Sequence, residues 1–178
     1  MIWLTADQHF CHSNILKLSG RPWGSIVEMN EALIGLWNGC VSEDDEVYIL
    51  GDFMYKGTEK QANEILFRLN GRKYLIRGNH EKYLEFPDFN VGAFEWVKDY
   101  HVLSYKDARF VFFHYPILEW AHYFRKSIHC YGHVHGNAIR GEVGAVDALG
   151  NRAFDVGVDT NNYCPVSIDF LYNKVYGE

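Results

Sequence analysis

Five short stretches of this chain carry the residue types that bind metal ions and transfer protons. The densest is Gly132-His133-Val134-His135. The other four are an Asp-x-His, a Gly-Asp pair, a Gly-Asn-His-Glu run and a histidine after an apolar run, at Asp7-Gln8-His9, Gly51-Asp52, Gly78-Asn79-His80-Glu81 and His114. One stretch alone is also typical of a polar turn. Because all five share the same residue types, we expect them to converge on one two-metal site.

The candidate ligands are carboxylate, amide and imidazole groups, and none is a cysteine. They are Asp7, His9, Asp52, Asn79, His114, His133 and His135. This set favours two divalent transition-metal ions, with Mn²⁺ first and Fe, Zn, Co or Ni as alternatives. Seven ligands are too many for one tetrahedral ion. Two ions about 3.5–4 Å apart, sharing a carboxylate, would clamp a phosphate, and water on such ions ionises near neutral pH. We therefore expect the metals to make the nucleophile.

The elements that position these residues begin with three predicted buried strands. The apolar runs at 2–6, 47–50 and 74–76 each end at one of the candidate stretches. In open α/β sheets, ligands bind at the carboxyl ends of the strands. The repeated placement therefore predicts that the candidate residues gather at one edge of a sheet.

Two helices are predicted between these strands by their capping signals. Ser25 and Glu28 form a capping box, and Asn38-Gly39 is expected to end the helix that follows. Thr58 and Gln61 form a second box, and the second helix is expected to stop at Asn70-Gly71. The pattern so far is strand, helix, strand, helix, strand.

The second half of the chain is predicted to be richer in strands. Residues 86–99 are aromatic and read as irregular, and residues 138–150 could form a flap or hairpin. The expected strands are a hairpin of 101–105 with 110–113, then 128–131, then a last central strand at 154–158; a short element follows 165–167. We expect one domain over residues 1–178, of α/β (α+β) class, with two packed mixed sheets and helices outside, as in an αββα sandwich.

Composition excludes several classes of protein. With 178 residues, 48% of them hydrophobic, the chain can bury a core. The formal net charge is −6 and no Lys/Arg block stands out, which argues against binding to duplex DNA. The four cysteines have no metal-binding spacing and read as free thiols of a reducing compartment. No signal peptide or run of about 20 apolar residues is visible. We expect a cytoplasmic protein without a membrane partner; its oligomeric state is open.

The order of the five stretches resembles the calcineurin-like metallophosphoesterase superfamily. All its blocks lie between residues 7 and 135. The resemblance implies that the first metal is held by Asp7, His9, Asp52 and His135, and that the second is held by Asn79, His114 and His133 with Asp52 as the bridge. It also implies that His80 is not a ligand. Beside the scissile phosphate, His80 would act as general acid or as a cation facing the phosphoryl oxygens.

One block departs from the protein Ser/Thr phosphatases of that superfamily. Their Gly-Asp-x-x-Asp-Arg-Gly is here Gly51 to Gly57, with Tyr55 in place of the Asp that would orient the histidine and Lys56 in place of the arginine. The chain is more similar to the small prokaryotic or phage phosphoesterases, many of which act on phosphodiesters or nucleotides. We expect a phosphohydrolase acting on a phosphomonoester or phosphodiester, on a nucleotide-like or small-molecule substrate. Two alternatives are a catalytically silent scaffold of the same fold that binds proteins, and a single-metal hydrolase of another ester.

Other polar residues have weaker assignments. Candidates for contact with the substrate are His12, Lys56 and Arg77. Arg21 and Arg125, like Lys56, read by default as surface charges, with phosphate contact as the alternative. His101, His122 and His129 read as structural. Aromatic residues near the motifs are core by default, and a few could stack on a nucleobase: Phe10, Trp23, Phe53, Tyr55, Tyr115, Trp120 and Tyr123.

Overall fold

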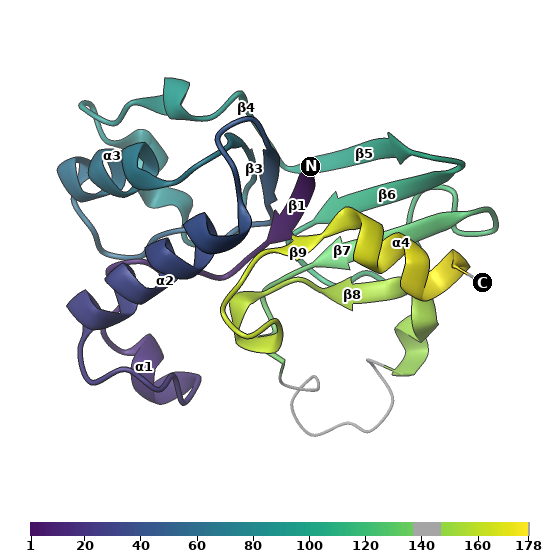
Figure 1. Ribbon diagram of the computed structural model, residues 1–178, viewed down its shortest axis with the longest axis horizontal. Helices are drawn as coiled ribbons and strands as arrows, with labels where there is room; N and C mark the ends of the chain where they lie inside the picture. The colour runs from purple at the N-terminus through teal and green to yellow at the C-terminus, as the bar shows by residue number, and fades with distance from the viewer. Residues whose placement is uncertain (137–146, 178) are drawn as a thin grey trace.

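A computed structural model of the protein describes residues 1–136 and 147–177. Its first sheet has the strand order β4-β3-β2-β1-β9 (Figure 1). The strands are β1 (Ile2–Thr5), β2 (Glu46–Ile49), β3 (Arg72–Ile76), β4 (Trp96–Lys98) and β9 (Val166–Ser167). Strands β1 to β4 are parallel and β9 is antiparallel to β1. The three predicted strands are confirmed. β4 lies within the segment that we expected to be irregular.

The second sheet has the strand order β5-β6-β7-β8. Its strands are β5 (Tyr100–Tyr105), β6 (Ala108–Phe113), β7 (Ser127–Tyr131) and β8 (Ala153–Asp155). β5 and β6 form the predicted antiparallel hairpin, and β6, β7 and β8 are parallel. Of the flap or hairpin expected at 138–150, residues 138–146 lie outside the described residues. From Asp147 to Arg152 the chain forms the 3₁₀ segment η3, which is kinked at Gly150, where φ is 70° and ψ is −170°.

The prediction of a central strand at 154–158 is wrong in two respects. β8 is the edge strand in the described part of the second sheet, and it ends at Asp155. The reason is a change of partner: Gly157 forms a parallel bridge with Ala6, and the amide of Val158 donates to the carbonyl of Ala6. The chain thus crosses from the second sheet to the end of β1, where the 3₁₀ helix η4 (Val158–Thr160) begins.

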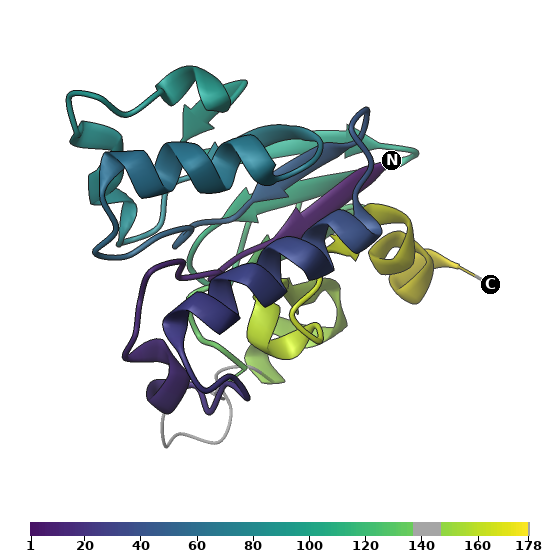
Figure 2. The same ribbon diagram turned by 60° about the vertical axis from the view of Figure 1, so that its left-hand side comes forward.

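The two sheets pack face to face around apolar side chains. Leu4, Leu50 and Ile76 come from the first sheet or the residues at its strand ends. They meet Phe110 and Phe112, and α4 (Ile168–Tyr176) adds to the same cluster. On the other face of the first sheet, a second cluster joins the sheet to the helices α2 (Ile26–Cys40) and α3 (Glu59–Arg68), as Figures 1 and 2 show. The expected class, two mixed sheets flanked by helices, is confirmed.

The capping residues start the helices as predicted. Ser25 caps α2, although Glu28 returns its side chain to the amide of Gly24 and not to that of Ser25. Thr58 and Gln61 form a complete capping box on α3. The helix α3 ends at Arg68, two residues before the predicted stop at Asn70-Gly71.

The stop predicted at Asn38-Gly39 is wrong, because α2 continues to Cys40. Asn38 serves a tertiary contact: its amide binds the carbonyl of Arg68 and the amide of Asn70. Shorter helices are α1 (Ile15–Leu18) and the 3₁₀ turns η1 (Glu81–Glu85) and η2 (Val91–Ala93). Among the described helices, none has the length and apolarity required to cross a bilayer.

Candidate metal centre

The loops that follow β1 and β2 run side by side beyond the end of the sheet. The amide of Asp7 donates to the carbonyl of Gly51, and the amide of His9 donates to the carbonyl of Asp52, both at 3.0 Å. Asp7, His9 and Asp52 all have positive φ angles, of 59°, 51° and 56°. Such backbone conformations are strained in residues other than glycine and collect at functional sites. The positive φ angles point these side chains in directions that a regular strand does not allow.

The first group of candidate ligands comes from opposite ends of the chain. Asp7, His9 and His135 place ligand atoms within 4.8 Å of one another. Asp7 and His9 are buried. Oδ1 of Asp7 and Nε2 of His9 are shielded from solvent and have no hydrogen-bond partner among the described residues. Buried polar atoms are normally paired, so a cation at this position would satisfy both.

The second group lies where the two sheets meet. Asp52, His114 and His133 also place ligand atoms within 4.8 Å of one another. Nε2 of His114 is 3.2 Å from Oδ1 of Asn79. Nδ1 of the same ring is 2.7 Å from the carbonyl of Leu50, which leaves Nε2 as the free ligand nitrogen. All seven predicted ligands are therefore divided between two adjacent groups.

Asp52 lies between these groups. Its Oδ2 is 3.5 Å from Nε2 of His9, and its Oδ1 is 3.6 Å from Nε2 of His114. The two oxygens of one carboxylate thus face one histidine from each group. This is the arrangement that a bridging carboxylate requires.

His80 forms a third group with His9 and Asp52. Its amide donates to Oδ1 of Asp52 at 3.0 Å, and its Nε2 is 3.8 Å from Oδ2 of Asp52. The side chain is 30% exposed, so it can meet a ligand from solvent. The ring of Tyr55 contacts it edge-on, with 4.5 Å between centroids. His80 is therefore oriented by an aromatic contact and a backbone hydrogen bond.

The charges of the site also fit a bound cation. Burial, then repulsion from Asp155 and Asp52, raises the pKa of the Asp7 carboxyl well above its ordinary value. Burial lowers the pKa values of His9, His114 and His133. The imidazoles are thus held neutral, as metal ligands must be. A divalent cation would offset the repulsion between the carboxylates.

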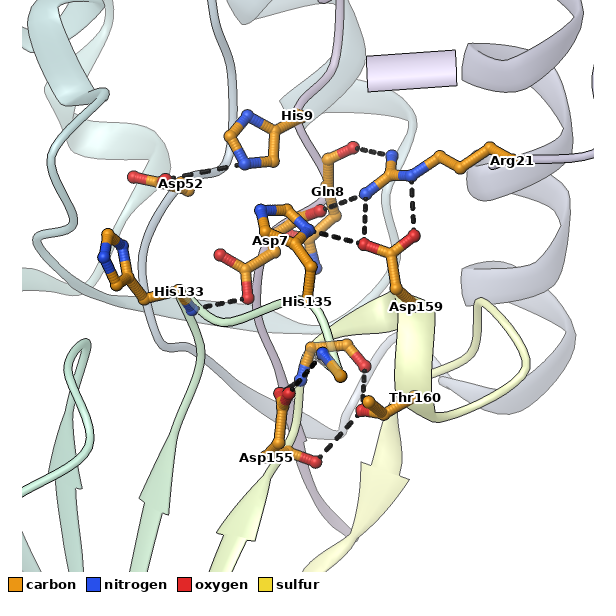
Figure 3. A network of polar contacts seen from close by, with 12 residues as sticks. Asp7, Gln8, His9, Arg21, Asp52, His133, His135, Asp155, Asp159 and Thr160 are labelled. Carbon is orange, nitrogen blue, oxygen red and sulfur yellow. Dashed lines mark hydrogen bonds and ion pairs between the residues drawn. The ribbon is translucent and has the colours of Figure 1, made fainter. Parts of the chain in front are cut away.

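A buried ion pair between Arg21 and Asp159 contacts the first group of candidate ligands, as Figure 3 shows. Nδ1 of His135 is 2.6 Å from Oδ2 of Asp159, and Arg21 binds both oxygens of Asp159 at 2.8 and 2.9 Å. Arg21 also donates to the carbonyls of Asp7 and Gln8. One guanidinium thereby connects the loop after β1 with the residue that orients His135.

Our interpretation of Arg21 as a surface charge is wrong, because Arg21 is only 4% exposed. Asp159 and Asp155 were not predicted from the sequence. Asp155 accepts hydrogen bonds from the amides of Gly136 and Gly157 and raises the pKa of Asp7. A signal for Asp155 was present, since it follows an apolar run as Asp52 does. No local signal marked Asp159.

Glu81 fastens the loop after β2 to the loop after β3. Its buried carboxyl accepts from the amide of Phe53 at 3.0 Å and from that of Gly78 at 2.5 Å. Burial, then the charge of Asp52, raises its pKa to about 7. The loops approach so closely that a Cβ on Gly51, which has φ of +94°, would lie 2.8 Å from Cα of Gly78. Glycine is required there.

The weaker candidates divide between the site and the surface. His12 adjoins the site, with Nδ1 3.3 Å from Nδ1 of His9. Lys56 is exposed, and its amino group lies 5.2 Å from the centroid of the Tyr55 ring. Arg77 is paired on the surface with Asp99, at 3.2 Å. The remaining residues, His101, His122, His129 and Arg125, do not belong to the three ligand groups, and His129 is fully buried.

Comparison with known proteins places this geometry in a family. Residues 1–134 match the family model described as calcineurin-like phosphoesterase. The chain is 35% identical over 175 residues to the uncharacterized protein MJ1445 of Methanocaldococcus jannaschii, covering 98% of this chain and 90% of that protein. It is 36% identical over 83 residues to the Gene 66 protein of Mycobacterium phage D29, covering 46% of this chain and 40% of that one.

A solved structure has the same fold. The protein of unknown function AQ665 from Aquifex aeolicus superposes with a TM-score of 0.73 at 26% identity, covering 96% of this chain and 97% of that one. The matched range of the family model contains every candidate ligand except His135, the residue that follows its last position. The protein belongs to the calcineurin-like phosphoesterase family.

Proposed function

We propose that this protein is a two-metal phosphohydrolase that cleaves a phosphomonoester or phosphodiester of a small molecule or nucleotide. The observation that carries the proposal is the position of Asp52, whose two oxygens face His9 and His114 at 3.5 and 3.6 Å. Family membership supports the same class of reaction. We further propose a reducing, cytoplasmic location, supported by four cysteines that are all free thiols.

Each side chain has one task in this proposal. The first ion would be held by Asp7, His9 and His135, and the second by His114 and His133, as the two groups are arranged. Asp52 would join both ions, and Asn79 would complete the second. Divalent cations in such a site lower the pKa of water and offset the charge of a phosphate; we propose Mn²⁺ first.

His80 would act on the substrate and not on a metal. Its partly exposed ring lies beside Asp52, where it can donate a hydrogen bond to a phosphoryl oxygen or a proton to the departing oxygen. The edge-on contact with Tyr55 limits its rotation. In this chain an aromatic ring therefore holds the histidine that protein phosphatases of the superfamily orient with a carboxylate.

The test is hydrolysis of p-nitrophenyl phosphate, a monoester, and bis(p-nitrophenyl) phosphate, a diester. The protein is loaded separately with Mn, Fe, Zn, Co or Ni. Replacing a general acid costs about 10²- to 10⁴-fold in rate, so we expect a loss of that size in His80→Ala. Asp52→Asn should also lower the metal content below two ions per chain. Matched controls are His122→Ala and Asp99→Asn, which alter exposed residues outside the site.

The same assay separates the alternatives. Hydrolysis of neither ester with any of the five metals would contradict the proposal. A metal content far below two ions per chain would favour the protein-binding scaffold. One ion per chain, without inhibition by phosphate, would favour a single-metal hydrolase of another ester.

A further inference from the structure

A cavity of about 240 Å³ lies beside His80, next to the metal-ligand groups. Its walls include Tyr55, Lys56, Lys82 and Phe86. Among the described residues, His80 is the one member of the ligand groups that lines it. The cavity holds several water volumes of about 30 Å³ each, but it is smaller than the roughly 300–1,000 Å³ of a complete ligand site. Its size therefore fits one ring-sized part of a larger ligand.

The position of His80 links this cavity to the reaction. On one side Nε2 of His80 is 3.8 Å from Oδ2 of Asp52. On the other side its ring meets that of Tyr55, which lines the cavity. A phosphate bound at the proposed metal centre beside His80 can therefore extend its ester substituent into the cavity.

The walls are suited to a planar, largely apolar group. Tyr55 and Phe86 contribute aromatic rings, and Met54 adds a polarizable thioether. Aromatic side chains bind planar rings by stacking, regardless of the ring's pattern of hydrogen-bonding groups. Tyr83 also lines the cavity, and its buried hydroxyl has no hydrogen-bond partner among the described residues.

Two exposed lysines give the cavity a positive edge. Lys56 and Lys82 come from the loop after β2 and from η1. In contrast to Lys106 and Lys126, which pair with aspartates, neither has an ion pair within the described residues. The chain as a whole carries a formal charge of −6, so this edge differs in sign from the molecule as a whole.

We propose that the cavity binds the ester substituent of the substrate, and that this substituent is a planar aromatic ring that carries an anionic group of its own. The ring would lie between Tyr55 and Phe86, and its charge would face Lys56 and Lys82. This inference rests on the proposed function, because it assumes that a phosphate is bound at the metal centre beside His80.

The test is equilibrium binding, by titration calorimetry, of three phosphonates that cannot be hydrolysed. Methylphosphonate, benzylphosphonate and p-carboxybenzylphosphonate are titrated into the metal-loaded protein. Stacking of one ring is worth about 1–3 kcal/mol, so benzylphosphonate should bind at least about fivefold more tightly than methylphosphonate. Two partly screened charge contacts should give the carboxylate a further gain of about fivefold.

Variants assign each gain to its residues. In the double variant Lys56→Gln/Lys82→Gln, the gain from the carboxylate should disappear while the gain from the ring remains. In Phe86→Leu the gain from the ring should fall. The control is Lys98→Gln: the amino group of Lys98 lies 4.3 Å from the centroid of the Trp96 ring, as that of Lys56 lies over Tyr55, but outside the cavity. Lys98→Gln should preserve both gains.

Equal binding of the three phosphonates, or of none, would overturn the inference. So would a carboxylate gain that survives in the double lysine variant. If the p-nitrophenyl esters are hydrolysed but the gains are absent, the cavity proposal fails while the proposed function stands. If the gains appear but no ester is hydrolysed with any metal, the proposed function fails and the cavity remains a ligand site.

Discussion

Oδ2 of Asp159 lies 2.6 Å from Nδ1 of His135, although the two residues come from different segments at the end of the sheets. With Nδ1 engaged, the proton of the imidazole is held on the side of Asp159 and Nε2 is free to bind a metal. Arg21 fixes the carboxylate of Asp159 with two further hydrogen bonds. The orientation of one candidate ligand thus depends on an ion pair that no ligand motif contains.

The first prediction concerns this contact. Asp159→Asn should lower the affinity for metal by about 10- to 100-fold, as loss of a group that orients a histidine ligand usually does. The measurement is a competition titration with a chelator. Asp169→Asn is the matched control, because Asp169 forms an exposed ion pair with Lys106. Unchanged affinity in Asp159→Asn would show that packing alone orients His135.

The second prediction compares two arginines that each bind a carboxylate with two nitrogens. Arg21 is buried with Asp159, whereas the side chains of Arg68 and Glu31 are 37% and 56% exposed. Breaking a buried pair leaves an uncompensated charge and costs about 3–5 kcal/mol. An exposed pair contributes little, because solvent screens it. In protein from which a chelator has removed the metal, Arg21→Met should therefore be far more destabilising than Arg68→Met. Urea denaturation measures both, and equal losses would contradict the buried role.

The third prediction concerns the approach of the loops after β2 and β3. Gly51→Ala places a Cβ 2.8 Å from Cα of Gly78 at a φ of +94°, so we expect a loss of about 2–4 kcal/mol in unfolding free energy. Gly39→Ala is the control: Gly39 lies inside α2 with no atom within 4 Å of the added Cβ. There alanine should stabilise the protein by about 0.5–1 kcal/mol. The measurement is thermal unfolding with a chelator present. If both substitutions changed the unfolding free energy in the same direction, the prediction would be wrong.

The fourth prediction is a pH dependence from His129, which is buried beneath the stacked ring of Trp120. Burial lowers its pKa from 6.5 to about 4. Below pH 6.5 His129 becomes protonated in the unfolded chain, whereas in the folded chain it stays neutral until about pH 4. The stabilisation by neutral His129 is therefore complete above pH 6.5 and is lost as the pH falls. The loss should be about 1.4 kcal/mol per pH unit, or about 3 kcal/mol in all.

The variant His129→Phe isolates this effect, because the other histidines titrate equally in both proteins. The unfolding free energies of the two proteins, freed of metal by a chelator, are measured by denaturant-induced unfolding from pH 4 to pH 7. The wild type should lose about 3 kcal/mol relative to the variant over that range. Parallel curves would mean that His129 is protonated in the folded protein.

The sequence by itself determined which side chains are available to bind a metal and which strands position them. Burial and strand ends are local patterns, so the acids and histidines after 2–6, 47–50 and 74–76 could be assigned to one sheet edge. The first residues of the helices could also be predicted, because a capping residue such as Thr58 binds groups within one turn of its own helix. The end of α2 was not, because Asn38 satisfies groups on another helix instead of stopping its own.

Only the tertiary structure decided which distant groups meet. Arg21 reaches Asp159 across 138 positions of sequence, and nothing near Arg21 distinguishes it from a surface cation. The same holds for the contact of Tyr55 with His80 and for the lysines beside it. Local patterns report the periodicity and burial of one element at a time. Ion pairs, cavities and the orientation of a carboxylate depend on how elements pack, and here the packing brings loops that follow strands of both sheets together around Asp52.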